Sequence, residues 1–340
     1  MILKSKRSSW AYIVARVKVM KRRLIPSEEY RKLLNMDFNE IVRYLEETDY
    51  KREIDELAYK YSGPRLLDYA LTLNLGRTYK KIQDVSFGIA KDLITEYLRR
   101  WDIWNIINII RGKMAGVSAE EIEESLVPVG EYTIDFYKSL IPKEIDEIVK
   151  TFEGTPYYSA LSKVGSEPLS IIEDELYKIY YQKILRERPS EFALKLFVDF
   201  IKMEIDIKNI KTILRLKRED VSTEEIMKRI IPGGFEITEE EAAKLSAMAW
   251  DELTKALEGY WFSKGIEGIT DKSISRIEIK FDKAWMEVVA KRASNYPLSI
   301  LPVLQYMVLK KIEVDNLRTL GWGKWQGIPN EEIEEQLVIL

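Results

Sequence analysis

The chain has 340 residues, 46% hydrophobic and 32% charged, so it can bury a sizeable core, which argues against disorder. Its 53 Lys and Arg against 56 Asp and Glu give a formal net charge of −3, which argues against nucleic acid as the main partner. The absence of Cys and His excludes disulfides, thiolate zinc sites, Cys nucleophiles and every His-based triad.

The first 27 residues form a basic segment with no acid before Glu28. Such a segment suits a place near an anionic surface, a nucleic acid or an acidic partner. Arg16 and Lys18 interrupt its apolar part, which argues against a signal sequence. Because no apolar stretch reaches the roughly 18 residues that span a bilayer, we expect a cytoplasmic chain, soluble or peripheral to a membrane. The basic side chains are Lys4, Lys6, Arg7, Arg16, Lys18, Lys21, Arg22 and Arg23.

Helix is the dominant pattern along the rest of the chain. Apolar residues recur at helical spacing over residues 90–101, 194–205 and 301–312, which predicts three long helices, each closing a module. Ser118 and Ser222 each precede a Glu by three residues and predict the start of a short helix. Residues 274–281 alternate imperfectly like a strand, but their equivalents in the repeats described next are helical. The chain is therefore predicted to be all-α.

One polar pattern occurs three times. It consists of an acid, an Asn three residues later, a Lys eight residues after the Asn, and a Glu pair seven and eight residues after the Lys. The three Asn residues are 104 and 107 positions apart. The copies are Asp102, Asn105, Lys113, Glu120 and Glu121; Asp206, Asn209, Lys217, Glu224 and Glu225; and Glu313, Asn316, Lys324, Glu331 and Glu332.

A second marker supports the same period. It covers residues 45–50 and 152–157, with a degraded form at 257–262, at separations of 107 and 105 residues. A period of about 105 is too long for one small solenoid unit and predicts domain-sized helical modules. We expect modules at 1–110, 111–214 and 215–340, arranged in a line or around a pseudo-three-fold axis.

A shorter fourth copy lies at the N-terminus. Lys21 aligns with Lys324, and residues 25–26 and 28–30 align with 328–329 and 331–333. The basic N-terminal segment is therefore expected to belong to the folded repeat.

The acid, Asn and Lys of each copy fall on one face of a continuous helix. The Asn and the Lys follow the acid by three and eleven residues, and both steps bring a side chain back to nearly the same direction around the helix axis. In one interpretation, the three polar stripes line a shared surface, such as a central socket for a partner. In the other, they form hydrogen bonds that lock each module, since Asn within a helix needs a partner for its amide. The rule that buried polar groups are satisfied favours the second. The candidate partner-binding residues are Asp102, Asn105, Lys113, Asp206, Asn209, Lys217, Glu313, Asn316 and Lys324.

Other polar groups in the pattern have a structural interpretation. The Glu pairs could hold a metal, but adjacent residues do not share a helix face, and acids favour the first turn of a helix. Arg111 and Arg215 could bind an anion, yet Trp322 stands at the third position, so a symmetric anion site is not expected. The sequence lacks the GxxxxGK[ST], GxGxxG and HExxH motifs. We therefore expect no catalytic residue, cofactor or metal, and no small-molecule substrate.

These features resemble a known family. Residues 12–21, the Leu45-x-x-Thr48-x-Tyr50 turn and the polar pattern repeated three times are similar to the rotary-ATPase component that is named C in archaeal ATP synthases and d in vacuolar ATPases. The resemblance covers essentially the whole chain. Trp322 and the degraded marker at 257–262 depart from the pattern and blur its symmetry.

The resemblance implies an all-helical, funnel-shaped protein with three similar modules about a pseudo-three-fold axis and no active site. It implies a peripheral place on the cytoplasmic face of the membrane, between the proteolipid ring and the D and F subunits of the rotor axle, where the protein transmits torque. The main alternative is a generic helical scaffold that binds other proteins. Nucleic-acid binding through residues 1–27 and a carboxylate-metal enzyme are further alternatives.

Overall fold

The computed structural model describes residues 2–186, 191–267 and 273–340, and their side chains from residue 10 onward. The basic side chains of Lys4, Lys6 and Arg7 therefore lie outside the described part. Apart from one isolated bridge between Val164 and Glu167, every regular element in the described part is a helix. The all-α prediction is confirmed.

The chain divides into two compact units. Unit 1 comprises Met1–Tyr180 and Tyr306–Pro329, and unit 2 comprises Tyr181–Gln305 and Asn330–Leu340. The division into three modules stays a prediction. Unit 1 contains α1 (Ile2–Lys21), α2 (Ser27–Leu34), α3 (Phe38–Leu45), α4 (Lys51–Leu57), α5 (Gly63–Val85), α6 (Ile89–Leu98), α7 (Arg100–Met114), α8 (Ala119–Glu124), α9 (Ile134–Leu140), α10 (Ile145–Thr151) and α11 (Tyr158–Leu161). Unit 2 contains α13 (Phe192–Arg218), α14 (Thr223–Arg229), α15 (Glu239–Ala247), α16 (Trp250–Ala256), the 3-10 helices η1 (Leu257–Gly259) and η2 (Ser263–Gly265), α17 (Ile274–Asn295) and α19 (Asn330–Glu334). The unit boundaries fall within α12 (Leu169–Arg186) and α18 (Leu301–Trp325).

The three long helices predicted from apolar periodicity are present. The second and third are α13 and α18, whereas the first is divided at Arg99 into α6 and α7. Residues 274–281 open α17, so helix is the correct interpretation of that segment. Ser118 and Ser222 cap α8 and α14, each accepting a hydrogen bond from a backbone amide three residues later, as predicted.

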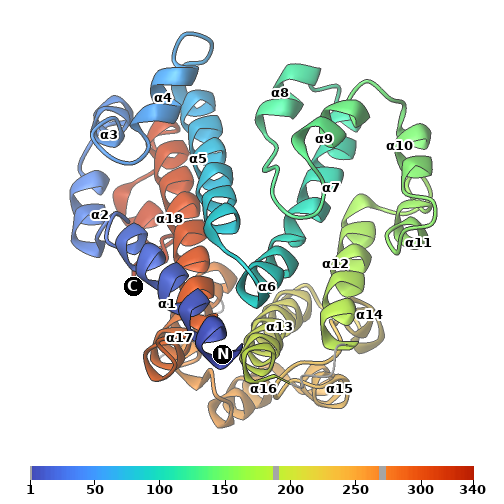
Figure 1. The fold of residues 1–340 in the computed structure, drawn as a ribbon. Coiled ribbons are helices and arrows are strands. Elements are labelled where there is room, and N and C mark those ends of the chain that lie inside the picture. Colours follow the sequence, from blue (N-terminus) through green and yellow to red (C-terminus); the bar gives the residue numbers. More distant parts are fainter. Residues whose placement is uncertain (1, 187–190, 268–272) are drawn as a thin grey trace. The chain divides into compact units, whose positions relative to one another are not determined.

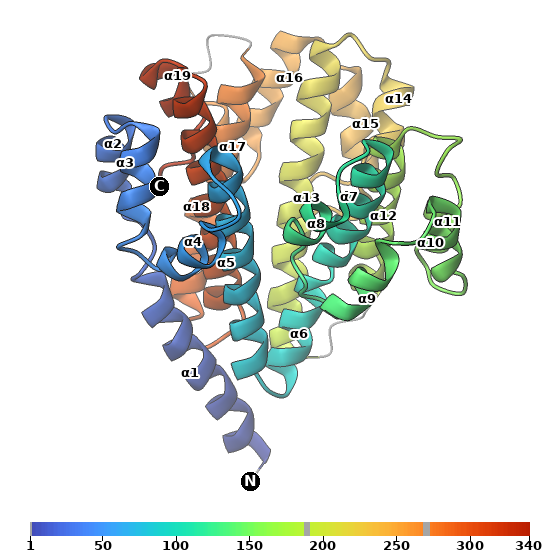
Figure 2. The ribbon, with the colours of Figure 1, turned by 90° about the horizontal axis from the view of Figure 1, so that it is seen from above.

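In unit 1, α5 packs against α1, α4, α6 and α8. Figures 1 and 2 both show α18 running alongside α5. The buried Tyr79 hydroxyl on α5 donates a hydrogen bond of 2.6 Å to the carbonyl oxygen of Met307 on α18. Arg318 on α18 forms an ion pair with Asp68 on α5. These contacts join the last long helix to helices from the beginning of the chain.

In unit 2, α13 packs against α14, α15 and α17. The η2 segment lies close to α17, where a Cβ atom added at Gly265 would come within 2.6 Å of the Phe281 ring. Phe262 and Phe281 are both fully buried, with ring centroids 5.5 Å apart. An aromatic cluster therefore fills the space beneath the 3-10 turns.

The long helices α7, α13 and α18 end in the same way. The amides of Val117, Val221 and Ile328 each donate to a carbonyl five residues earlier, at 2.9, 3.0 and 2.9 Å. The preceding residue has a positive φ in each case, as a Schellman ending requires: 68° at Gly116, 54° at Asp220 and 71° at Gly327. The repeat seen in the sequence is thus also a repeat of backbone conformation.

Candidate functional site

The Asn of each polar stripe lies in the core of its unit. Asn105 on α7 accepts a hydrogen bond of 2.9 Å from the Val127 amide and donates one of 2.8 Å to the Val127 carbonyl. Asn209 on α13 makes the same pair of bonds with Ile231, at 2.9 and 2.8 Å. In both copies the Asn holds a residue 22 positions later. Its amide therefore satisfies two backbone groups of an otherwise irregular loop.

The acid of each stripe holds the next part of the same loop. Asp102 accepts hydrogen bonds from the amides of Glu131 and Tyr132 and from the Tyr137 hydroxyl, the last at 2.6 Å. In unit 2, the acid is Asp206, which is bonded at 2.8–3.0 Å by three consecutive amides, at residues 235–237, and by the indole of Trp261. Each carboxylate therefore anchors a loop and receives a bond from one aromatic side chain.

The Lys of each stripe holds the end of a short helix. Lys113 donates a hydrogen bond of 2.9 Å to the carbonyl of Ile141, directly after α9. Lys217 donates one of 2.8 Å to the carbonyl of Ser246 near the end of α15. The positive charge lies where the helix dipole favours it.

In the third copy, residues from the N-terminus take the place of a downstream loop. Glu313 accepts hydrogen bonds from the Ile25 amide at 2.6 Å and the Tyr50 hydroxyl at 2.7 Å. Lys324 donates to the carbonyl of Leu34 at the end of α2. These contacts make α2 the counterpart of α9 and α15. The sequence alignment of Lys21 with Lys324 instead predicts that α2 corresponds to α8 and α14. The contacts of Glu313 and Lys324 show that this alignment is wrong by one short helix.

Eight of the nine stripe residues thus form hydrogen bonds with backbone groups of the protein itself. The three acids and three Asn residues are buried, with Asp102, Asn105 and Asp206 at 0% exposure, and the three Lys side chains are half-buried. The contacts support the interpretation in which the stripes lock each module. Direct binding of a partner by these residues stays a prediction.

Burial raises the pKa of the Asp102 carboxyl to about 6, although the bonds from Tyr137 and the two amides oppose this. The unfolded value is roughly 3.9. Between these values the folded state holds one more proton than the unfolded state, so the free energy of unfolding falls as pH rises from about 4 to about 6. We expect the stability difference between wild type and Asp102→Asn to fall by about 2–3 kcal/mol across this range, measured by urea unfolding. A constant difference would show that the carboxylate is ionised throughout.

The remaining charged residues of the pattern form ion pairs. Arg111 pairs with Glu173 at 2.8 Å, and Arg215 makes the equivalent contact with Glu278. The Glu pairs lie in the first turns of α8, α14 and α19, as predicted. Within the described residues, no group of three or more acids is arranged to hold a metal ion.

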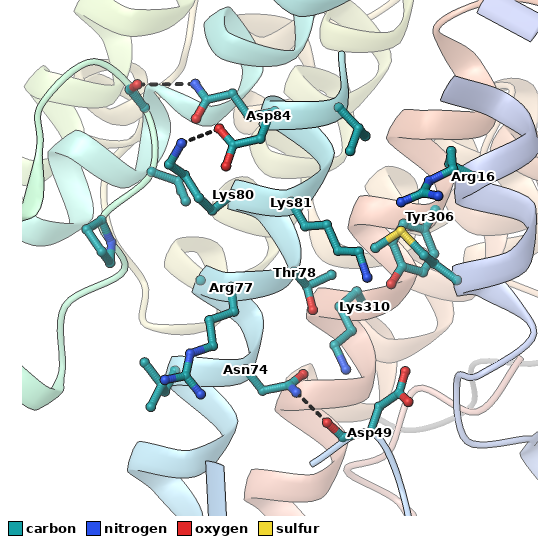
Figure 3. A pocket seen from close by; sticks show the side chains of 18 of the residues that line it. Arg16, Asp49, Asn74, Arg77, Thr78, Lys80, Lys81, Asp84, Tyr306 and Lys310 are labelled. Atoms are coloured by element: carbon teal, nitrogen blue, oxygen red, sulfur yellow. Dashed lines mark hydrogen bonds and ion pairs between the residues drawn. The ribbon is translucent and has the colours of Figure 1, made fainter. Parts of the chain in front are cut away.

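Sequence reasoning missed a pocket in unit 1, shown in Figure 3. It has a volume of about 1320 Å³ and is lined mainly by α1, α5, α18 and the loop before α9, with further residues from α4 and α6. Arg16 on α1 and Lys81 on α5 reach into it from opposite sides, Tyr306 of α18 lies between them, and Lys310 of α18 lies beside Lys81 on the side toward Asp49. Burial and the nearby Glu313 carboxylate raise the pKa of Tyr306, so its hydroxyl stays protonated. The basic composition of residues 1–27 was the available signal for this pocket.

These features define a helical repeat protein whose polar motifs hold its own loops. Among the described residues, no helix is both long enough and apolar enough to cross a bilayer. The sequence matches the family described as ATP synthase (C/AC39) subunit over residues 13–336. The chain belongs to this family, whose members are structural and not catalytic subunits of the ATP synthase.

Curated relatives agree over the full length. The C subunit of the A-type ATP synthase of Archaeoglobus fulgidus is 64% identical over 340 residues, covering 100% of this chain and 99% of that protein. The proteins of the same name from Methanococcoides burtonii and Haloferax volcanii are 39% and 31% identical. These alignments cover 98% and 97% of this chain, and 95% and 97% of the relatives.

Proposed function

We propose that this protein is the adaptor that joins the D and F subunits of the rotor axle to the membrane proteolipid ring of a rotary ATPase. It lies at the cytoplasmic face of the membrane and transmits torque between ATP turnover and ion translocation. The proposal includes three modules about a pseudo-three-fold axis in a funnel-shaped molecule. Family membership and the three equivalent helix-and-loop arrangements support it.

The proposed contact with the proteolipid ring rests on three exposed apolar side chains. Phe87, Phe192 and Leu298 lie just before or at the start of α6, α13 and α18, and their exposed fractions are 47%, 61% and 59%. They are 105 and 106 residues apart, which matches the repeat period. A large apolar side chain exposed 17 or 18 residues before the Asn of every copy favours a protein contact. A ring of apolar subunits offers the same surface several times, as three equivalent contacts require.

The test is binding of the triple variant Phe87→Ser, Phe192→Ser and Leu298→Ser to a detergent-solubilised proteolipid ring, followed by native mass spectrometry. Each buried side chain contributes about 1.5–3 kcal/mol, so affinity for the ring should fall at least about tenfold while affinity for the axle pair persists. The matched control replaces Met114, Val117 and Phe235, which are 60%, 40% and 42% exposed, with Ser.

Unchanged ring binding by the triple variant would show that these three side chains do not form the contact. Wild-type protein that binds neither ring nor axle would contradict the adaptor role and favour the generic helical scaffold.

A further inference from the structure

The pocket of unit 1 has the form of a groove between two helices. Its α1 wall consists of Tyr12, Ala15, Arg16, Val19 and Met20, which follow helical spacing along one face. The facing wall runs along α5 from residue 73 to residue 85, about 18 Å at 1.5 Å per residue. The volume of about 1320 Å³ exceeds the roughly 300–1,000 Å³ of a small-molecule site. A groove of this length and volume fits about three turns of a helix.

The unpaired charges of the groove are positive. Its acids all have cationic partners within unit 1: Asp49 pairs with Arg23, Glu53 with Arg77, Asp84 with Lys80, and Glu131 with Arg99. By contrast, the side chains of Arg16, Lys81 and Lys91 line the groove with no hydrogen-bond or ion-pair partner among the described residues. An occupant must therefore supply negative charge.

The groove also has an apolar component. Val19 on α1 is 56% exposed, and Ala15 and Tyr12 beside it are exposed as well. Leu73 and Val85 contribute apolar lining from α5. A helix that alternates acidic and apolar faces would pair its carboxylates with the free cations and cover the exposed apolar side chains.

We propose that this groove binds an acidic amphipathic helix of a partner protein. The inference rests on the proposed function for the identity of that partner, which is the axle pair D and F. The groove would then be the axle contact, and the exposed side chains at residues 87, 192 and 298 would be the ring contact. The two surfaces meet where the rings of Tyr12 and Phe87 lie 6.2 Å apart.

The test is the dissociation constant of the purified axle pair for the full chain, measured by isothermal titration calorimetry. In the variant Arg16→Glu/Lys81→Glu, both cations become carboxylates facing an acidic partner, so binding should weaken at least about tenfold. The control Lys18→Glu/Arg22→Glu makes the same change in net charge at exposed positions that do not line the groove. Its affinity should stay within about threefold of wild type, since charges outside the contact act mainly through screened long-range attraction.

A second variant tests the groove without changing charge. Ala15→Trp projects a large ring into the groove from an exposed position, so it should block the axle while leaving the fold intact. Circular dichroism and thermal unfolding verify the fold of each variant. Loss of axle binding in both groove variants, with ring binding retained, is the expected result.

The possible failures are distinguishable. If wild type binds the axle and both groove variants bind it equally well, the groove inference is wrong and the proposed function stands. If the groove variants lose the ring instead of the axle, the groove belongs to the ring contact and the inference is again wrong. If wild type does not bind the axle, the proposed function fails and the groove inference fails with it.

Discussion

Replacing Glu313 with Leu should lower the free energy of unfolding by about 3–5 kcal/mol. Glu313 and Lys310 are 4% and 3% exposed and form an ion pair of 2.8 Å, which the buried Tyr50 hydroxyl joins. Without the carboxylate, Lys310 is left as an uncompensated buried charge. The Ile25 amide also loses its acceptor.

The double variant Glu313→Leu/Lys310→Met separates the cost of the uncompensated Lys310 charge from the cost of the unpaired Ile25 amide. Replacing both members of a buried pair with apolar residues removes the charge penalty, so most of the lost stability should return. Recovery should be incomplete because the Ile25 amide stays unpaired. Urea unfolding of the wild type, both single variants and the double variant gives the coupling energy. Additive losses would show that the pair is not coupled and would contradict this account.

Gly234→Ala is expected to have a comparable effect in unit 2. A Cβ atom at this position would overlap both the Asp206 carboxylate and the Ile237 carbonyl. To relieve the overlap, Asp206 would have to leave the three amides, that of Ile237 among them, and the Trp261 indole from which it accepts hydrogen bonds. Overpacking and the loss of buried hydrogen bonds together should cost about 3–5 kcal/mol, measured by thermal and urea unfolding.

Gly259→Ala is the matched control, because an added Cβ there would have no heavy atom within 4 Å and the backbone does not need a positive φ. Its effect should stay within about 1 kcal/mol. If Gly234→Ala lost no more stability than Gly259→Ala, overlap with the Asp206 carboxylate would not determine the cost at Gly234.

The sequence predicts the helices and the internal repeat because both depend on local periodicity. Asn105 and Asn209 stand out in the sequence because a polar amide on an apolar helix needs a partner. Their partners could not be named, since they are backbone groups of Val127 and Ile231, and any residue type supplies those groups. The sequence therefore shows which side chains anchor a loop, but not which loop they anchor.

The contact between the chain ends was beyond sequence reasoning. Glu313 and Lys324 bind Ile25 and Leu34, residues 288 and 290 positions away. No local periodicity links such distant residues. The alignment of Lys21 with Lys324, the one that the sequence offers, is shifted by one short helix from the correspondence that the contacts show. The groove was missed for the same reason, because its walls α1 and α5 and its α18 residues come from opposite ends of the chain.

This contact between the chain ends determines when the protein can finish folding. During synthesis, Glu313 and Lys324 leave the ribosome 288 and 290 residues after their partners Ile25 and Leu34. Domains made of neighbouring residues can fold as the chain emerges, but contacts this distant must wait until both partners have been synthesised. Phe38 at the start of α3, which is buried in the final structure and packs edge-on against the Trp325 ring at 5.3 Å, lacks this contact for most of translation. A nascent chain stalled before residue 313 should consequently be a preferred substrate for chaperones.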